Sequence, residues 1–433
     1  MSSNDTFKDY KVKHLFLLVG ENPLPNYVAA MKLLENGGTA YLVYTAQTVS
    51  QKARLKMRLK GFSSKEVNLE NNKSNAHQIF KKVQEEAAKI PSNERIGLHY
   101  TGGTNTMAVH AHRAIFDVRG TDAVYSYLDA KTLEIFIDHP NSDSTHRGVQ
   151  LTVSLEDLFK LHKYEWQENK TPLTKPILAD AAAEFVRLYQ NEEEIAKTWR
   201  TWSNTHHNKN NPNKNNGQLK EAIDSETGWW KSEDELSKLS LSLKGVHSDI
   251  IEVLRQQLDA SETQLSLKLT KAKGFNSCQQ VCEWLGGIWL EHYVLQQVKE
   301  LTEDLQLGES KMSFVIKKSQ TWGGGVFEFD VAFMRSYQLF AISCTTSKDP
   351  KECKLKLFEA YTRAKQLGGD EARVALVCCC DNDNSKTPHL SRYLKSQLEG
   401  ALSNRKIAVF LREDLPKLKE KIADWVKDNK GAL

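Results

Sequence analysis

The stretch HYTGGTNTMAVHA, residues 99–111, joins the end of an apolar strand to the start of a helix. Backbone N–H groups at such a turn point outward and the helix dipole adds positive potential, so the turn favours an anionic ligand. Gly102 and Gly103 allow close approach to the backbone, and the neighbouring Thr and Asn side chains suit phosphates and sugar hydroxyls. The stretch lacks the Walker lysine and the GxGxxG spacing. A plain glycine-rich turn is the alternative interpretation.

The segments before and after this turn alternate between strand and helix patterns. Strand followed by helix, repeated, predicts a parallel sheet covered on both faces, with ligands bound at the carboxyl ends of the strands. A second polar loop, GENPLPN at 20–26, follows the first strand at the same predicted edge, so two loops face one ligand. The predicted strands are 14–19, 39–44, 95–100 and 124–128, and the predicted helices are 26–34, 75–88 and 107–116.

Bulk properties describe an ordinary globular chain of 433 residues, long enough for two domains and a connector. Its mean hydropathy is −0.53, and no apolar run approaches the roughly 20 residues that span a bilayer. The polar segment 1–13 lacks the apolar core of a secretory signal, which predicts a cytoplasmic protein with no membrane partner. A net charge of +4 is too small to indicate nucleic-acid binding by itself.

All seven cysteines lie in the second half of the sequence, and their odd number favours reduced thiols. Cys278 and Cys282 share a predicted helix face without further ligands at zinc spacing. Cys378, Cys379 and Cys380 end an apolar run and are interpreted as small buried residues of a strand.

The second half predicts a helical region followed by a small α/β unit. A helix is expected at 172–190, an Asn/Lys-rich linker at 204–218, and polar helices at 228–271. A two-strand hairpin with a short turn at 335–338 follows a further helix. The elements expected here are a helix at 278–301, strands at 326–334 and 339–344, a helix at 351–367 that ends at two glycines, and strands at 373–379 and 406–411.

Three N-terminal stretches resemble the CRISPR-associated Rossmann fold (CARF) sensor of nucleases from type III CRISPR systems. They are LFLLVGENPLPNYVAA at 15–30, LVYTAQT at 42–48 and HYTGGTNTMAVHA at 99–111. The resemblance implies a homodimer that binds a cyclic oligoadenylate, cyclic tetra-adenylate in that family, across its twofold axis. The family has lysine where this sequence has Asn105. The residues implied in ligand binding are Gly20, Glu21, Asn22, Pro23, Thr45, Thr101, Gly102, Gly103, Thr104, Asn105 and Met107.

The segments WLGGIWLEHYV at 284–294 and GGVFEFDVAFMRSYQLFAISCTTS at 324–347 resemble the PD-(D/E)xK nuclease domain of the same family. Such a fold cleaves phosphodiesters with Mg²⁺ or Mn²⁺ held by carboxylates, and with a lysine. The resemblance implies Glu291 and Asp330 as metal ligands, with Glu328 beside them. Ser343 and Thr345 stand where the family has Glu and Lys, so the catalytic set reads Glu291, Glu328, Asp330, Ser343 and Thr345.

Candidate replacements for the missing glutamate and lysine lie just downstream: Lys348, Lys351, Lys354 and Glu359. The leading hypothesis is an endonuclease, activated by cyclic oligoadenylate and dependent on metal, that degrades single-stranded RNA or DNA in antiviral defence. The alternative is a nuclease-like effector without catalysis that binds nucleic acid or a partner.

Histidines and tryptophans provide weaker candidates. His99, His110 and His112 flank the TGGT turn, where they are either ordinary helix-surface residues or groups that cleave the bound ring. The tryptophan pairs 229–230 and 284/289 either stack on bases or pack in the core.

The predicted fold class is therefore α/β, with three parts. A Rossmann-like CARF domain is expected at 1–165, a helical connector at 166–271, and a restriction-endonuclease-like α/β domain at 272–433.

Overall fold

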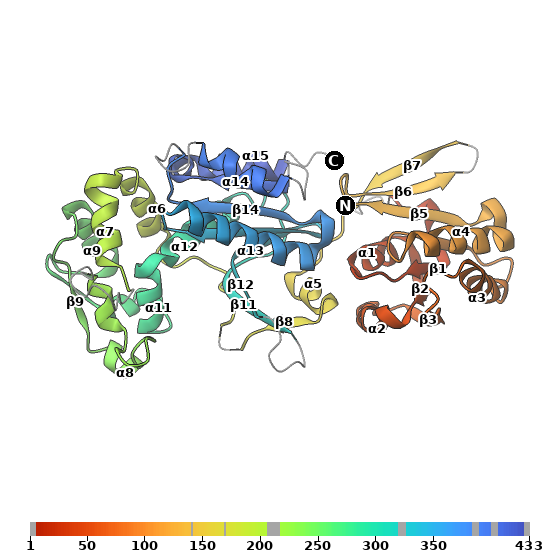
Figure 1. Ribbon diagram of the computed structural model, residues 1–433, viewed down its shortest axis with the longest axis horizontal. Coiled ribbons are helices and arrows are strands. Elements are labelled where there is room, and N and C mark those ends of the chain that lie inside the picture. The colour runs from red at the N-terminus through yellow and green to blue at the C-terminus, as the bar shows by residue number, and fades with distance from the viewer. Residues whose placement is uncertain are drawn as a thin grey trace.

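The computed structural model contains two large sheets and, at the far end of the second one, a helical region that includes a small two-stranded sheet (Figure 1). None of the helices in the described part of the chain is long and apolar enough to cross a membrane. Most of the predicted Asn/Lys-rich linker falls outside the described residues, which are 6–139, 142–168, 170–205, 217–318, 326–382, 389–399 and 406–427.

The N-terminal domain is built on a seven-stranded sheet. Its strands are β1 (Val12–Leu18), β2 (Leu34–Tyr44), β3 (Ser63–Asn68), β4 (Ile96–His99), β5 (Val124–Asp129), β6 (Glu134–His139) and β7 (Ser142–Gly148). The order is β3-β2-β1-β4-β5-β6-β7, in which the first five positions are parallel and the last two strands are antiparallel. The strands β2 and β3 lie on one side of β1, and β4 and β5 lie on the other. The switch point of the sheet, where the strand order reverses, therefore lies between β1 and β4.

Helices cover both faces of this sheet. They are α1 (Leu24–Leu33), α2 (Val49–Arg58), α3 (Ala76–Ala88) and α4 (Asn105–Arg119). Apolar residues of α1 and α2 pack on one face and those of α3 and α4 on the other, in two separate cores. The predicted parallel α/β arrangement is confirmed. The strands β3, β6 and β7 were not predicted. Two of them, β3 and β7, are largely exposed at the sheet edges and lack apolar alternation.

The C-terminal sheet has six strands. They are β8 (Tyr164–Trp166), β11 (Ser310–Lys318), β12 (Val326–Arg335), β13 (Gln338–Thr345), β14 (Arg373–Cys378) and β15 (Ile407–Phe410). The order is β15-β14-β13-β12-β11-β8, and β13, β14 and β15 are parallel. Because β8 pairs with β11, the chain enters this sheet before residue 165, where the boundary was predicted.

Helices also sandwich the second sheet. They are α5 (Leu155–Leu161), α11 (Cys278–Glu283), α12 (Trp289–Glu300), α13 (Pro350–Gly368), α14 (Leu390–Glu399) and α15 (Leu418–Lys427). Apolar residues of α12 and α15 pack on one face, and those of α5, α13 and α14 on the other. The helix α13 runs along the sheet toward the N-terminal domain (Figure 1).

The helical region packs against α12. It comprises α6 (Ala179–Leu188), α7 (Lys197–Trp202), α8 (Glu233–Leu236), α9 (Ser248–Leu258), α10 (Leu267–Lys271) and a two-stranded antiparallel sheet of β9 (Ser240–Ser242) and β10 (Gln264–Ser266). The prediction of purely helical structure at 228–271 was wrong at these two strands. Trp284 and Trp289 are buried in the core of this region, so they do not stack on bases, and Cys278 and Cys282 are buried there too.

Candidate functional site

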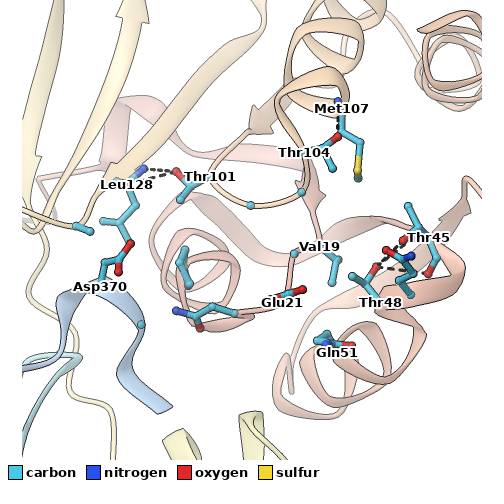
Figure 2. Close-up of a pocket in the computed structure, with 18 of the residues that line it drawn as sticks. Val19, Glu21, Thr45, Thr48, Gln51, Thr101, Thr104, Met107, Leu128 and Asp370 are labelled. Atoms are coloured by element: carbon cyan, nitrogen blue, oxygen red, sulfur yellow. Dashed lines mark hydrogen bonds between the residues drawn. The ribbon is translucent and has the colours of Figure 1, made fainter. Parts of the chain in front are cut away.

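A pocket of about 770 Å³ lies at the carboxyl ends of β1, β2 and β4, at the switch point of the N-terminal sheet. Its volume is in the range of small-molecule binding sites. Figure 2 shows the loops after these strands around one space. Nine of the eleven residues implied by the resemblance line it: Gly20, Glu21, Asn22, Thr45, Thr101, Gly102, Gly103, Thr104 and Met107.

The TGGT turn is fixed by hydrogen bonds at both of its ends. The backbone N–H of Leu128 donates to Oγ1 of Thr101 at 2.6 Å. Thr104 is the N-cap of α4: its hydroxyl oxygen accepts from the N–H of Met107 at 3.2 Å and its O–H donates to the carbonyl of Lys73 at 2.9 Å. The helix α1 also begins at this edge, so two helix N-termini face the pocket and favour an anionic ligand.

The glycines of the turn serve a purpose that the sequence analysis did not predict. Gly102 has φ +118, and a Cβ atom there would lie 2.4 Å from the carbonyl oxygen of Leu18. A Cβ on Gly20 would lie 2.8 Å from the backbone N of Gly103. The glycines therefore allow the loops after β1 and β4 to pack against each other. This contact between the two loops forms the floor of the pocket.

The loop after β1 is tied to the first helix. Asn22 Oδ1 accepts from the N–H of Leu24 at 3.0 Å, and the fully buried Asn26 donates to the carbonyl of Leu18 at 2.9 Å. After β2, the side chains of Thr45 and Thr48 cap a short turn. Further polar lining residues that the sequence analysis did not single out are Gln47, Thr48, Gln51 and Lys73.

One wall of the pocket comes from the C-terminal domain. Lys365 of α13 and the turn Gly369–Asp370–Glu371 that follows this helix line the pocket, and Figure 2 shows Asp370 facing the side of Leu128. The amide nitrogen of Asn22 lies so close to Gly369 that a Cβ there would be 2.2 Å from it. Burial raises the pKa of Glu371 to about 7. The two domains therefore share this site.

Five residues predicted near the ligand do not line the pocket. Pro23 is the N-cap of α1, and Asn105 is the exposed first residue of α4. His99 is fully buried with its ring nitrogen 3.0 Å from the Ser126 hydroxyl, and burial lowers its pKa to about 3. His110 and His112 are also absent from the lining. Among the residues that the structure describes, no histidine lines this pocket.

A second, smaller pocket of about 60 Å³ surrounds Asp330 in the C-terminal sheet. The Asp330 carboxylate accepts hydrogen bonds from the Ser343 hydroxyl at 2.8 Å and from the backbone N–H of Cys344 at 2.7 Å. Burial raises the pKa of Asp330 despite these bonds. Ser343 therefore orients the carboxylate instead of adding a second negative charge.

Glu291 approaches from α12 on the other side of the sheet. The helix is interrupted by a π turn, Trp284–Ile288, where Gly287 has φ 146 and a Cβ would lie 3.0 Å from Oγ1 of Thr346. The hydroxyl of Ser313, which has a strained φ of 48, donates to Glu291. Burial, and then the nearby charge of Asp330, raise the pKa of Glu291. The Asp330 carboxylate is therefore close enough to act electrostatically on Glu291.

Glu328 is more exposed than Asp330. Its side chain is half exposed and forms an ion pair with Lys170. Within the described residues, the oxygens of Glu291, Glu328 and Asp330 do not form a cluster in which all lie within 4.8 Å. Asp330 lines the pocket and Glu291 does not, but both offer carboxylate oxygens, the ligand type that Mg²⁺ and Mn²⁺ prefer. Glu328 remains at the rim of the pocket.

The nearby lysine is Lys356, which the sequence analysis missed. Its Nζ lies 3.9 Å from Oδ2 of Asp330, and this carboxylate raises the pKa of Lys356. Lys354 points elsewhere and donates to Gln397 at 2.8 Å. Thr345 contacts Glu352 at 3.4 Å. Among the proposed replacements Glu359 lines the pocket, whereas Lys348, Lys351 and Lys354 do not.

Neither a family model nor a curated protein matches this chain. Solved structures do. Protein VC1899 from Vibrio cholerae aligns with a TM-score of 0.73 and 14% identity, over 97% of this chain and 100% of that one. Can2 from Sulfobacillus thermosulfidooxidans, solved in complex with cyclic tetra-adenylate, aligns with a TM-score of 0.62 and 15% identity, over 95% and 99%.

A type III CRISPR defence DNA nuclease activated by cyclic oligoadenylate aligns with a TM-score of 0.50 and 17% identity. The alignment covers 84% of this chain and 45% of that nuclease. At these identities the likeness concerns the fold. It confirms the predicted α/β fold class and, at the level of fold, the resemblance to CARF nucleases.

Proposed function

We propose that this protein is a metal-dependent endonuclease that is activated by a cyclic oligoadenylate in type III CRISPR antiviral defence. The observation that carries the proposal is the 770 Å³ pocket at the switch point, in a fold shared with a protein solved with cyclic tetra-adenylate. Single-stranded RNA or DNA is the proposed substrate.

The chemistry of the pocket suits a nucleotide ring. Two helix N-termini and the ammonium groups of Lys73 and Lys365 attract phosphates. Threonine hydroxyls can form hydrogen bonds with ribose. The side-chain amides of Gln47 and Gln51 can form hydrogen bonds with the N6 amino group and N7 of adenine. A ring with repeated units requires repeated binding groups, so a homodimer that presents this pocket twice is part of the proposal.

Asp330 in the second pocket, together with Glu291 of α12, would hold Mg²⁺ or Mn²⁺, and such an ion supplies charge neutralisation to a phosphodiester. Ser343 and the N–H of Cys344 orient the Asp330 carboxylate. Lys356 places a positive charge beside it and takes the role of the family lysine, which is Thr345 in this chain. A lysine from α13 stabilises negative charge that develops on the phosphate.

The helix α13 connects the two pockets. Lys365 at its last turn lines the sensor pocket, and Lys356, Glu359 and Arg363 line the pocket of Asp330. A ligand that changes the position of the turn at Gly369 therefore acts on the element that carries Lys356. This contact provides a physical route from ligand binding to cleavage.

The alternative, an effector without catalysis, rests on one observation. The Asp330 carboxylate already has three partners, Ser343, Cys344 and Lys356, with which a metal ion must compete. In that case Asp330 is a structural residue, and the C-terminal domain binds nucleic acid or a partner without cutting it.

The test measures cleavage of labelled single-stranded RNA, single-stranded DNA and plasmid with Mn²⁺, with and without cyclic tetra-adenylate or cyclic hexa-adenylate. Binding of each ring is measured separately by calorimetry. We expect cleavage that depends on one ring and is lost in Asp330→Asn, which still binds the ring. Ring binding without cleavage supports the alternative, and absence of ring binding refutes the sensor assignment.

A further inference from the structure

Three thiols meet beneath α13, outside both pockets. Cys353 lies in the first helical turns of α13, Cys378 ends β14, and Cys380 follows two residues later. Their sulfur atoms all lie within 4.8 Å of one another, and those of Cys353 and Cys380 are 3.2 Å apart. Within the described part of the chain, no other group of three His, Cys, Asp or Glu ligand atoms is this compact.

The local structure explains why the thiols converge. Alternate residues of an extended chain face the same side, so Cys378 and Cys380 point toward α13, whereas Cys379 packs in the opposite core. The start of α13 is fixed by Asp349, whose side chain accepts from the N–H of Lys351 at 3.1 Å. This cap sets Cys353 over the end of β14.

The geometry suits a thiophilic cation. A tetrahedral zinc ion with Zn–S bonds of about 2.3 Å holds its sulfur ligands roughly 3.8 Å apart, which lies between the shortest and the limiting sulfur separations here. The carbonyl oxygen of Ser347 lies 3.6 Å from the sulfur of Cys380 and adds an oxygen at the cluster.

We infer that Cys353, Cys378 and Cys380 form a binding site for a thiophilic metal ion, with Zn²⁺ as the cation whose bond length to sulfur fits these separations. The bound ion fastens the start of α13 to the end of β14. Lys356 lies one helical turn after Cys353, so this attachment positions the lysine relative to Asp330. The metal site itself does not depend on the proposed nuclease activity.

The test uses full-length protein purified under reducing conditions without a histidine tag. Zinc is measured per chain by mass spectrometry. The metal-free protein is then titrated with Co²⁺, whose thiolate complexes absorb in the near ultraviolet. We expect one metal ion per chain and a charge-transfer band that saturates at one equivalent of Co²⁺ and disappears when Zn²⁺ is added.

The double variant Cys353→Ser/Cys380→Ser should lose the zinc and the band, while Cys379→Ser, a buried thiol on the opposite face, should keep both. Circular dichroism checks that both variants are folded. The wild-type titration decides the question even if the double variant unfolds, because absence of the band in the wild type overturns the inference. A band that persists in a folded double variant also overturns it.

Discussion

Replacement of Lys356 by methionine tests whether α13 supplies the missing nuclease lysine. Methionine keeps the length and apolar stem of the side chain and removes its charge. Lys356 Nζ lies 3.9 Å from Asp330 Oδ2. At that distance and an effective dielectric of about 20, two unit charges attract by about 4 kcal/mol.

The lysine side chain is 38% exposed, so solvent screening reduces this interaction, to about 2 kcal/mol. A phosphate bound beside Asp330 would place its negative charge at a similar distance from the ammonium group of Lys356. A range of about 2–4 kcal/mol corresponds to about a 30- to 1,000-fold decrease in rate. Loss of one oriented charge-stabilising group has a comparable effect in other enzymes.

The assay follows cleavage of labelled nucleic acid in single turnovers with saturating ring and Mn²⁺. Lys354→Met is the matched control, because Lys354 lies on the same helix but donates to Gln397. We expect the control to cleave within a few-fold of wild type, and Lys356→Met to bind the ring normally. Wild-type cleavage by Lys356→Met would refute the assignment of this lysine.

Three further outcomes are expected. Gly102→Ala should lower the free energy of unfolding in urea by about 2–4 kcal/mol, against about 1 kcal/mol for Gly37→Ala, which also has positive φ but open space around it. Glu371, with its pKa raised to about 7, stabilises the fold when protonated. Stability should therefore fall by up to about 3 kcal/mol as pH rises from about 4.5 through 7, and Glu371→Gln should remove this dependence. Asn22→Ala should reduce the ratio of ring-activated to basal cleavage; an unchanged ratio argues against transmission through this contact.

The sensor loops could be predicted from sequence because their signals are local. An apolar strand, a run of Gly, Thr and Asn, and a helix start follow one another within about a dozen residues at 96–107. The edge strands could not be predicted because they are polar: Ser63–Asn68, for example, shows no apolar alternation. The actual purpose of Gly102 depends on the approach of Leu18 from another strand, which a local pattern cannot reveal.

Lys356 could not be predicted from its residue type alone. Its position around the helix axis is also needed. Cys353, Leu357, Ala364 and Leu367 are the buried apolar face of α13, at spacings that a helical wheel reveals. Lys356 borders that face, whereas Lys354 does not. The position of Lys356 on the helical wheel would have favoured it over Lys354. Its distance to Asp330, however, depends on how α13 packs on the sheet. The wall formed by Gly369 and its neighbours depends on the placement of one domain against another, for which no sequence signal exists.

The positions along α13 suggest how the molecule combines these parts. The proposed metal site holds the start of the helix, Lys356 lies one turn further, and Lys365 reaches the sensor pocket about 18 Å from Cys353 at 1.5 Å per residue. A helix fixed at one end and displaced at the other turns about the fixed end. Lys356 lies near that end, so ligand binding would reorient its ammonium group with little translation, while a loose anchor would let the lysine drift from Asp330. Zinc removal should therefore weaken ring-dependent cleavage more than ring binding.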